Sequence, residues 1–283
     1  MTNRADRVVR IGHSPDPDDA FMFYGIVAEK VDTRGYRIEQ VLEDIESLNR
    51  RALAGELEVS AVSVHAYASL ADRYALMSCG ASMGDGYGPL VVARAPLSPG
   101  DLASALIAVP GTLTSAFLAL RLYLGRAFRH TVVPFDRILD VVAAGQADAG
   151  LVIHEGQLTY REQKLHPVVD LGVWWGERTG GLPLPLGANA VRRDLGARAC
   201  GDLTAVLRDS IDFSLEHREA ALAYALDFGR GLDVPLADRF VGMYVNDLTR
   251  DLGPRGRAAV RRFLEEGAAA GAIPSVPVLD FVE

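Results

Sequence analysis

The sequence lacks the features that mark several common classes of protein. Its 283 residues include only two cysteines, Cys79 and Cys200, which are too few for a disulfide framework and lack the spacing of metal ligands. No apolar run approaches the roughly 20 residues that a membrane-spanning helix needs. No apolar segment with a small-residue cleavage site precedes the first predicted strand, which argues against export. We therefore expect a soluble, cytoplasmic protein that does not engage a membrane, unless a leader has been removed.

Positive charge and the standard catalytic motifs are also scarce. The 29 Lys and Arg residues are outnumbered by 37 Asp and Glu residues, which gives a formal net charge of −8. This balance argues against nucleic acid as a partner, although a local site on an acidic protein can still bind a small anion. The sequence contains no serine nucleophile elbow, no zinc-binding H-E-x-x-H, no P-loop and no dinucleotide fingerprint. Proton transfer by a histidine is the chemistry that remains.

What the sequence does contain is an alternation of apolar strands and amphipathic helices. The N-terminal part predicts, in order, a strand at Val8–Ile11, a helix capped by Asp18 or Asp19, a strand at Tyr36–Leu42, a helix capped by Asp44 that ends at Gly55, and a strand at Val59–Val64. Such an alternation indicates an α/β fold built on a mainly parallel sheet.

The segment 106–156 repeats this order of elements. A strand at Leu106–Val109 leads to a helix that begins near Thr114, and the run AGQAD at 144–148 echoes AGELE at 54–58. We therefore predict two lobes of one plan: a large discontinuous lobe over 1–93 and 188–283, and a small lobe over 94–187. The loops at the carboxyl ends of the two sets of strands should face each other across a ligand cleft. Three amphipathic helices are assigned to the large lobe, at Leu203–Leu215, Glu219–Phe228 and Arg255–Ala270.

A histidine stands at the end of one apolar strand. The run Gly150–Ile153 is followed by His154, Glu155 and Gly156. In open α/β sheets the carboxyl ends of the strands are where ligands bind, and an imidazole is well suited to act as a base near neutral pH. The alternative is a structural or surface histidine. If His154 is the base, Glu155 and Tyr160 are candidates to orient its ring.

Other polar residues fall at comparable places. Thr114 and Ser115 stand at a helix start, where they either bind a carboxylate or phosphate or merely cap the helix. Ser60 and Ser63 interrupt an apolar strand, and their partners are either neighbouring loops, which we favour for Ser60, or a ligand. Ser14 is also expected to line the cleft, and Asn49 and His13 are further candidates. The alternative for His13, which we favour, is a solvated loop histidine.

The combination of these segments resembles a known family. The segments are Ser14-Pro15-x-Pro17-x-Asp19, Asp44-Ile45-x-x-Leu48-Asn49, Val59–Tyr67, Gly84-Asp85-Gly86-Tyr87-Gly88-Pro89 and Ile153-His154-Glu155-Gly156. Together they resemble the menaquinone biosynthesis enzymes of the futalosine route, and most closely the branch that forms 1,4-dihydroxy-6-naphthoate. The resemblance implies a two-lobed fold of the periplasmic-binding-protein type (type II) with a central ligand cleft, in agreement with the lobes predicted above.

The resemblance also implies a reaction. It implies a lyase that converts cyclic dehypoxanthinyl futalosine, a small-molecule carboxylate, to 1,4-dihydroxy-6-naphthoate without a metal or another cofactor. His154 matches the family's proton acceptor. Residues Ala61, Val62 and Ser63, together with Thr114 and Ser115, match its substrate-contacting segments, and we add Ser14 and Asn49 as predicted substrate contacts. The oligomeric state is not indicated.

The sequence departs from the family pattern in the first loop. Asp18 and Ala20 stand where the family pattern leads us to expect an asparagine and a threonine, which puts a substrate role for these two positions in doubt. Two alternatives to the leading hypothesis stay open: a non-catalytic solute-binding protein located in the cytoplasm, and the sister branch of the family that dehydrates chorismate.

Overall fold

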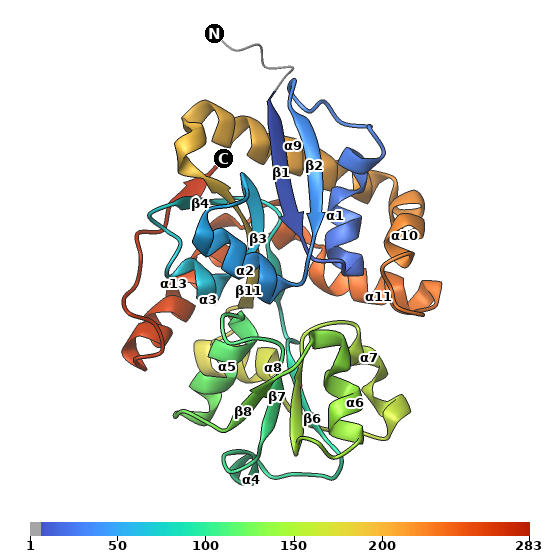
Figure 1. Cartoon of the computed structure of the whole chain (residues 1–283), viewed down its shortest axis with the longest axis vertical. Coiled ribbons are helices and arrows are strands. Elements are labelled where there is room, and N and C mark those ends of the chain that lie inside the picture. The colour runs from blue at the N-terminus through green and yellow to red at the C-terminus, as the bar shows by residue number, and fades with distance from the viewer. Residues whose placement is uncertain (1–6) are drawn as a thin grey trace. The chain divides into compact units, whose positions relative to one another are not determined.

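The structure, a computed structural model, describes residues 7–283 and comprises two compact units (Figure 1). Of the described residues, the first unit contains 7–82, 187–254 and 277–283, and the second contains 83–186 and 255–276. Residues 1–6, on which part of the expectation about export rests, lie outside the described range. Within 7–283, none of the helices combines the length and the apolar character that crossing a bilayer requires.

The first unit is built on a mixed sheet whose strand order is β12-β4-β11-β3-β1-β2, with β5 paired to β11. Strand β1 runs parallel to β2 and β3, as predicted, whereas β11 runs antiparallel to both β3 and β4. The strands are β1 (Val8–His13), β2 (Arg37–Leu42), β3 (Val59–Ser63), β4 (Tyr74–Met77), β5 (Ser82–Gly84), β11 (Leu184–Arg192) and β12 (Phe281–Val282).

Helix α1 is the buried centre of the first unit. After two acids in its first turn, its sequence is mostly apolar on all sides. Ala20, Phe21, Met22 and Phe23 are each 0% exposed, because the helix packs against α9, α10 and α11 as well as the sheet. Helix α2, by contrast, is amphipathic and packs against β3 through Leu48. The elements are α1 (Pro17–Val27), α2 (Ile45–Ala54), α3 (Val64–Tyr67), the 3₁₀ turn η4 (Arg193–Leu195), α9 (Ala197–Glu216), α10 (Arg218–Leu226), α11 (Val234–Tyr244) and α12 (Asp247–Arg250).

The second unit has a five-stranded sheet in the order β10-β6-β9-β7-β8. Strand β7 runs parallel to β8 and β9, and β6 runs antiparallel to β9 and β10. The strands are β6 (Leu90–Ala93), β7 (Ile107–Val109), β8 (His130–Val132), β9 (Ala149–Val152) and β10 (His166–Asp170). The helices and 3₁₀ turns are α4 (Pro99–Leu102), α5 (Ser115–Leu124), η2 (Phe135–Arg137), α6 (Ile138–Ala143), α7 (Gly156–Thr159), η3 (Tyr160–Gln163), α8 (Leu171–Thr179) and α13 (Gly253–Ala269).

The predicted repetition of one plan is confirmed. In each unit three parallel strands are joined by two helices, and the first strand lies between the other two: β2-β1-β3 in one sheet and β8-β7-β9 in the other. In each unit an antiparallel strand follows on the far side of the third, β11 beside β3 and β6 beside β9. The repeated strand ends are therefore equivalent positions in the two sheets.

The predicted lobe boundaries need correction at two places. Strand β6 pairs with β9 and β10, so residues 83–93 belong to the second unit. Residues 255–276 belong there too, because α13 packs its apolar face on that unit. The ring of Phe263 meets Trp175 edge-on at 5.4 Å between centroids, and Arg178 pairs with Glu266 at 2.7 Å. The amphipathic pattern of α13 predicts a helix but does not indicate which of the two units the helix packs against.

The predicted cap of α1 was also wrong. The N-cap is Asp16, followed by Pro17 at the first helical position, so Asp18 and Asp19 lie inside the first turn. The other predicted caps are confirmed. The Asp44 carboxylate accepts hydrogen bonds from the amides of Glu46 and Ser47, and Gly55 ends α2 in the left-handed conformation at φ 73°.

Candidate functional site

His154 follows β9 in the second unit and is held by two backbone groups. It is 4% exposed, its Nε2 lies 2.8 Å from the carbonyl oxygen of Phe135, and its Nδ1 lies 2.9 Å from the amide nitrogen of Gly156. A carbonyl only accepts and an amide N–H only donates, so Nε2 carries the proton and Nδ1 carries the lone pair. His154 is therefore held as one neutral tautomer.

Three residues, Phe135, Gly156 and Glu155, closely surround the ring of His154. The ring of Phe135 contacts that of His154 edge-on at 5.4 Å between centroids. A Cβ atom on Gly156 would lie 2.7 Å from Cε1 of His154, so only glycine leaves room for the ring there. The carboxylate of Glu155, itself 5% exposed, has an oxygen 3.6 Å from Nδ1. That distance is too long for a hydrogen bond, but it places a negative charge where it would stabilise a protonated ring.

These contacts decide between the candidates for orienting the ring. The groups that fix it are the Phe135 carbonyl and the Gly156 amide, which are main-chain atoms. Of the two predicted side chains, Glu155 lies beside Nδ1, whereas the hydroxyl of Tyr160 accepts a hydrogen bond from Arg161 at 3.1 Å. Sequence patterns give no signal for a main-chain partner that lies 19 residues away.

Thr114 and Ser115 stand at the start of α5, as predicted. Thr114 is the N-cap: its hydroxyl accepts from the amide of Phe117 at 3.1 Å and donates to the carbonyl of Gly111 at 3.0 Å. Ser115 donates to the carbonyl of Leu186 at 2.5 Å. Both side chains are 2% exposed. The capping interpretation is confirmed for Thr114, and binding of an anion at the same helix start stays a prediction.

In the first unit, β3 ends at Ser63 with a side-chain clamp. Asn49, on α2 and 0% exposed, accepts the Ser63 amide through Oδ1 at 2.8 Å and donates from Nδ2 to the Ser63 hydroxyl at 3.0 Å. Ser60 behaves differently, because its hydroxyl donates to the carbonyl of Ala61 at 2.9 Å. Between them, Ala61 is 6% exposed and Val62 is 0% exposed.

The end of β1 carries a cluster of acids. The amide of Ser14 donates to Asp19 at 2.8 Å, and the Ser14 hydroxyl donates to Asp16, which also pairs with Arg230 at 2.9 Å. Burial raises the pKa of Asp19 to about 7, against the lowering effect of its bond from Ser14. Burial, together with the charges of Asp19 and Asp16, also raises the pKa of Asp18 well above its ordinary value. A protonated acid is favoured here at neutral pH.

His13, predicted to be a solvated loop histidine or else to line the cleft, is instead the buried last residue of β1, so the solvated interpretation is wrong. It is 0% exposed and stacks on Phe23 at 4.3 Å between ring centroids. Its Nδ1 donates to the carbonyl of Ser14 at 3.0 Å, and burial lowers the pKa of the imidazole to about 4. His13 is therefore neutral at physiological pH.

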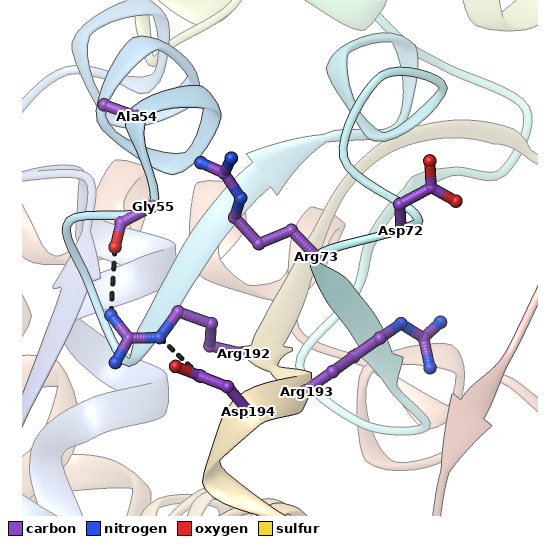
Figure 2. Close-up of a pocket in the computed structure, with 7 residues that line it drawn as sticks. All are labelled: Ala54, Gly55, Asp72, Arg73, Arg192, Arg193 and Asp194. Carbon is purple, nitrogen blue, oxygen red and sulfur yellow. Dashed lines mark hydrogen bonds and ion pairs between the residues drawn. The ribbon is translucent and has the colours of Figure 1, made fainter.

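A surface pocket of about 780 Å³ in the first unit is a separate feature (Figure 2). It lies at the opposite end of β3 from Ser63, because Val191, next to the lining residue Arg192, pairs with Val59. Arg73 donates to the carbonyl of Leu53 and Arg192 to that of Gly55, so these guanidinium groups satisfy the end of α2. The predicted site residues do not line it. The lining residues are Ala54, Gly55, Asp72, Arg73, Arg192, Arg193 and Asp194.

Two α/β units of one plan, each with an antiparallel strand beside the third repeated strand, are the architecture of solute-binding proteins. The alkanesulfonate-binding protein of Xanthomonas axonopodis pv. citri, bound to MOPS, matches 96% of each chain with a TM-score of 0.73 and 15% sequence identity. The periplasmic aliphatic sulphonate-binding protein of Escherichia coli matches 96% of this chain and 90% of that one, with a TM-score of 0.64 and 12% identity. The fold is thus of the periplasmic-binding-protein type.

Among the proteins that share this fold, the sequence matches one particular family. A profile of the menaquinone biosynthesis family matches residues 9–269, and the chain belongs to this family. It is 45% identical over 268 residues to 1,4-dihydroxy-6-naphthoate synthase of Thermus thermophilus, covering 94% of this chain and 97% of the relative. The enzyme of that name from Streptomyces coelicolor is 37% identical over 95% of both chains. A solved structure from Archaeoglobus fulgidus, 46% identical, has a TM-score of 0.90 over 96% of this chain and 100% of that one.

Proposed function

We propose that this chain catalyses the formation of 1,4-dihydroxy-6-naphthoate from cyclic dehypoxanthinyl futalosine, as a carbon–carbon lyase. The observation that carries the proposal is the identity to two relatives, 45% and 37%, each over at least 94% of this chain and both named for that product. The substrate is the one that the family resemblance implies. The reaction needs a base and a site for the substrate, and the described side chains supply candidates for both.

His154 is the proposed base, acting through Nδ1. This nitrogen holds the lone pair, while Nε2–H stays bonded to the Phe135 carbonyl throughout. An amide cannot donate to a protonated nitrogen, so proton uptake displaces the Gly156 amide from Nδ1. Glu155, 3.6 Å away, then stabilises the imidazolium. The proton comes from the sugar-derived part of the substrate, and formation of the aromatic naphthalenoid ring favours the release of that fragment.

The substrate contacts are proposed at the strand ends and helix starts described above. The start of α5 presents backbone N–H groups and a partial positive charge, which suit the substrate carboxylate. The carboxylate of Asp16 at the N-cap makes the start of α1 a poor place for that group. The proposed contacts are Ser14, Ala61, Val62, Ser63, Thr114 and Ser115.

A side-by-side assay tests the proposal. Purified protein is incubated with cyclic dehypoxanthinyl futalosine or with chorismate, with a metal chelator and no added cofactor, and products are separated by liquid chromatography. We expect 1,4-dihydroxy-6-naphthoate from the first substrate and no conversion of the second. Dehydration of chorismate would instead support the sister branch of the family. Binding of the first substrate without conversion would support a solute-binding protein.

A further inference from the structure

Asn49 and Ser63 form an arrangement that helix capping does not explain. Ser63 is the N-cap of α3, a position where a serine hydroxyl ordinarily accepts a hydrogen bond from the first turn of the helix. Here the hydroxyl makes no capping bond. It is held instead by the buried amide of Asn49, which binds both the main chain and the side chain of Ser63. The Ser63 hydroxyl therefore does not cap α3.

The geometry fixes the direction of the hydroxyl proton. An amide NH₂ group can only donate, so the bond of 3.0 Å from Nδ2 of Asn49 occupies a lone pair of the Ser63 oxygen. The proton of that hydroxyl must point elsewhere, and within residues 7–283 the Ser63 hydroxyl donates no hydrogen bond. Ser60, on the same strand, shows the contrast: its proton is used by the carbonyl of Ala61. Of the two serines, only Ser63 has a hydroxyl that donates no hydrogen bond within the described residues.

We propose that Asn49 is a positioning residue that makes Ser63 a hydrogen-bond donor to an acceptor oxygen of the substrate. This inference rests on the proposed function, since the ligand is the substrate named there. It also reassigns Asn49, which the sequence placed among the substrate contacts. Because Asn49 is 0% exposed and its Oδ1 and Nδ2 are both engaged with Ser63, it acts on the ligand through Ser63.

The alternative is that Asn49 merely ties α2 to β3, and Asn49→Asp separates the two roles. An aspartate has nearly the same shape and still accepts the Ser63 amide. Its second oxygen cannot donate, so it takes the Ser63 proton and turns the hydroxyl away from the substrate. We expect the KM and the Kd for cyclic dehypoxanthinyl futalosine to rise about tenfold, the effect of one lost hydrogen bond, with kcat changed less than about threefold.

A double-mutant cycle supplies the decisive readout. Ser63→Ala should raise KM by a similar factor, and Asn49→Asp should raise it no further when Ser63→Ala is already present. Ser60→Ala is the matched control and should leave KM unchanged. If Asn49→Asp fails to fold, as judged by circular dichroism, Asn49→Ala takes its place in the same cycle. Equal effects of the Asn49 variant with and without Ser63→Ala, or a loss of stability with KM and Kd unchanged, would overturn the inference.

Failure of the proposed function gives a different pattern. Calorimetric titration with cyclic dehypoxanthinyl futalosine measures Kd whether or not turnover occurs. Binding without turnover by the wild-type protein contradicts the proposed activity, while the cycle in Kd still tests Asn49. Turnover with a cycle that shows no coupling contradicts the inference alone. No binding to the wild-type protein would overturn both.

Discussion

In each of the two units, the same kind of turn and hydrogen bond connects the third repeated strand to the first. In each, a glycine with positive φ (Gly55 at 73°, Gly145 at 74°) ends the turn after the second helix. An acid three residues later accepts a main-chain amide at the neighbouring strand: Glu58 from Arg10 at 3.0 Å, and Asp148 from Leu106 at 2.8 Å. The acid ties the entry of the third strand to the first strand of each unit. The strands that precede Ser63 and His154 are therefore held in the same way in their two units. We call this shared arrangement of strands and links the framework.

The side chains placed on that framework differ completely. At the third strand, the first unit has Ser63, whose hydroxyl is directed by the side chain of Asn49. The second unit has His154, whose tautomer is fixed by main-chain atoms. The first helix of one unit begins among buried acids, whereas that of the other begins with Thr114 and Ser115. The framework therefore sets the position of a side chain, and the residue at each strand end determines its chemistry: a hydroxyl at Ser63 and an imidazole at His154.

Replacing His154 should produce the largest effect. His154→Gln keeps a side chain that can hydrogen-bond but removes the basic nitrogen, so we expect kcat to fall at least about 100-fold with substrate binding retained. Steady-state kinetics and calorimetric Kd values measure the two effects separately. Ser63→Ala is the comparison from the other unit and should change KM far more than kcat. Near wild-type kcat in His154→Gln would show that the base lies elsewhere.

Adding one methyl group at Gly156 should disturb the same base without touching its chemistry. A Cβ atom there would lie 2.7 Å from Cε1 of His154, which forces the ring to move. A displacement of this kind should lower kcat about 10- to 100-fold. Gly176→Ala in α8 is the matched control, because a Cβ atom there meets nothing within 4 Å. Equal kinetics of the two alanine variants would mean that the ring position observed here does not matter for turnover.

The acids at the start of α1 should make the stability of the first unit depend on pH. Burial raises the pKa of Asp19 to about 7, so the folded state favours the protonated acid. Its contribution to the free energy of unfolding is therefore lost as the pH rises from the unfolded value of 3.8 through about 7. Asp19→Asn, which mimics the neutral acid, should stabilise the protein by about 2 kcal/mol at pH 8 and progressively less toward pH 4.

Urea unfolding at several pH values measures this difference. Glu219→Gln is the control, because Glu219 lies exposed in the first turn of α10 and should show no gain that grows with pH. A pH-independent effect of Asp19→Asn would contradict a raised pKa at this position.

Features of the fold and the candidate site that depend on neighbouring residues could be predicted from the sequence, whereas those that depend on contacts between distant residues could not. Strands β1, β2, β3, β7 and β9, the repeated plan and the caps at Asp44 and Thr114 follow from local patterns, so they were predicted correctly. The assignment of α13 failed, because its apolar face alone does not indicate which unit it packs against. The partners of His154 could not be predicted, because a main-chain carbonyl at Phe135 carries no side-chain signal. The clamp of Asn49 on Ser63 required the packing of α2 on β3.

The smallest expected effect tests whether the shared framework is equally important in both units. Glu58 is 9% exposed, and although burial raises its pKa, the hydrogen bonds and charge of Arg10, with the charge of Arg192, lower it overall. Its stabilising contribution is present above about pH 4.5, the unfolded value, and is lost as the pH falls through the lower folded value. Glu58→Gln should therefore cost about 1–2 kcal/mol at pH 7, and progressively less as the pH falls below about 4.5. Asp148 is exposed, and within residues 7–283 its carboxylate has only the Leu106 amide as partner, so Asp148→Asn should cost less than about 1 kcal/mol. Urea unfolding of both variants measures the difference. Equal losses of unfolding free energy would mean that Arg10 and Arg192 add no stability to the link that Glu58 makes between the first and third strands.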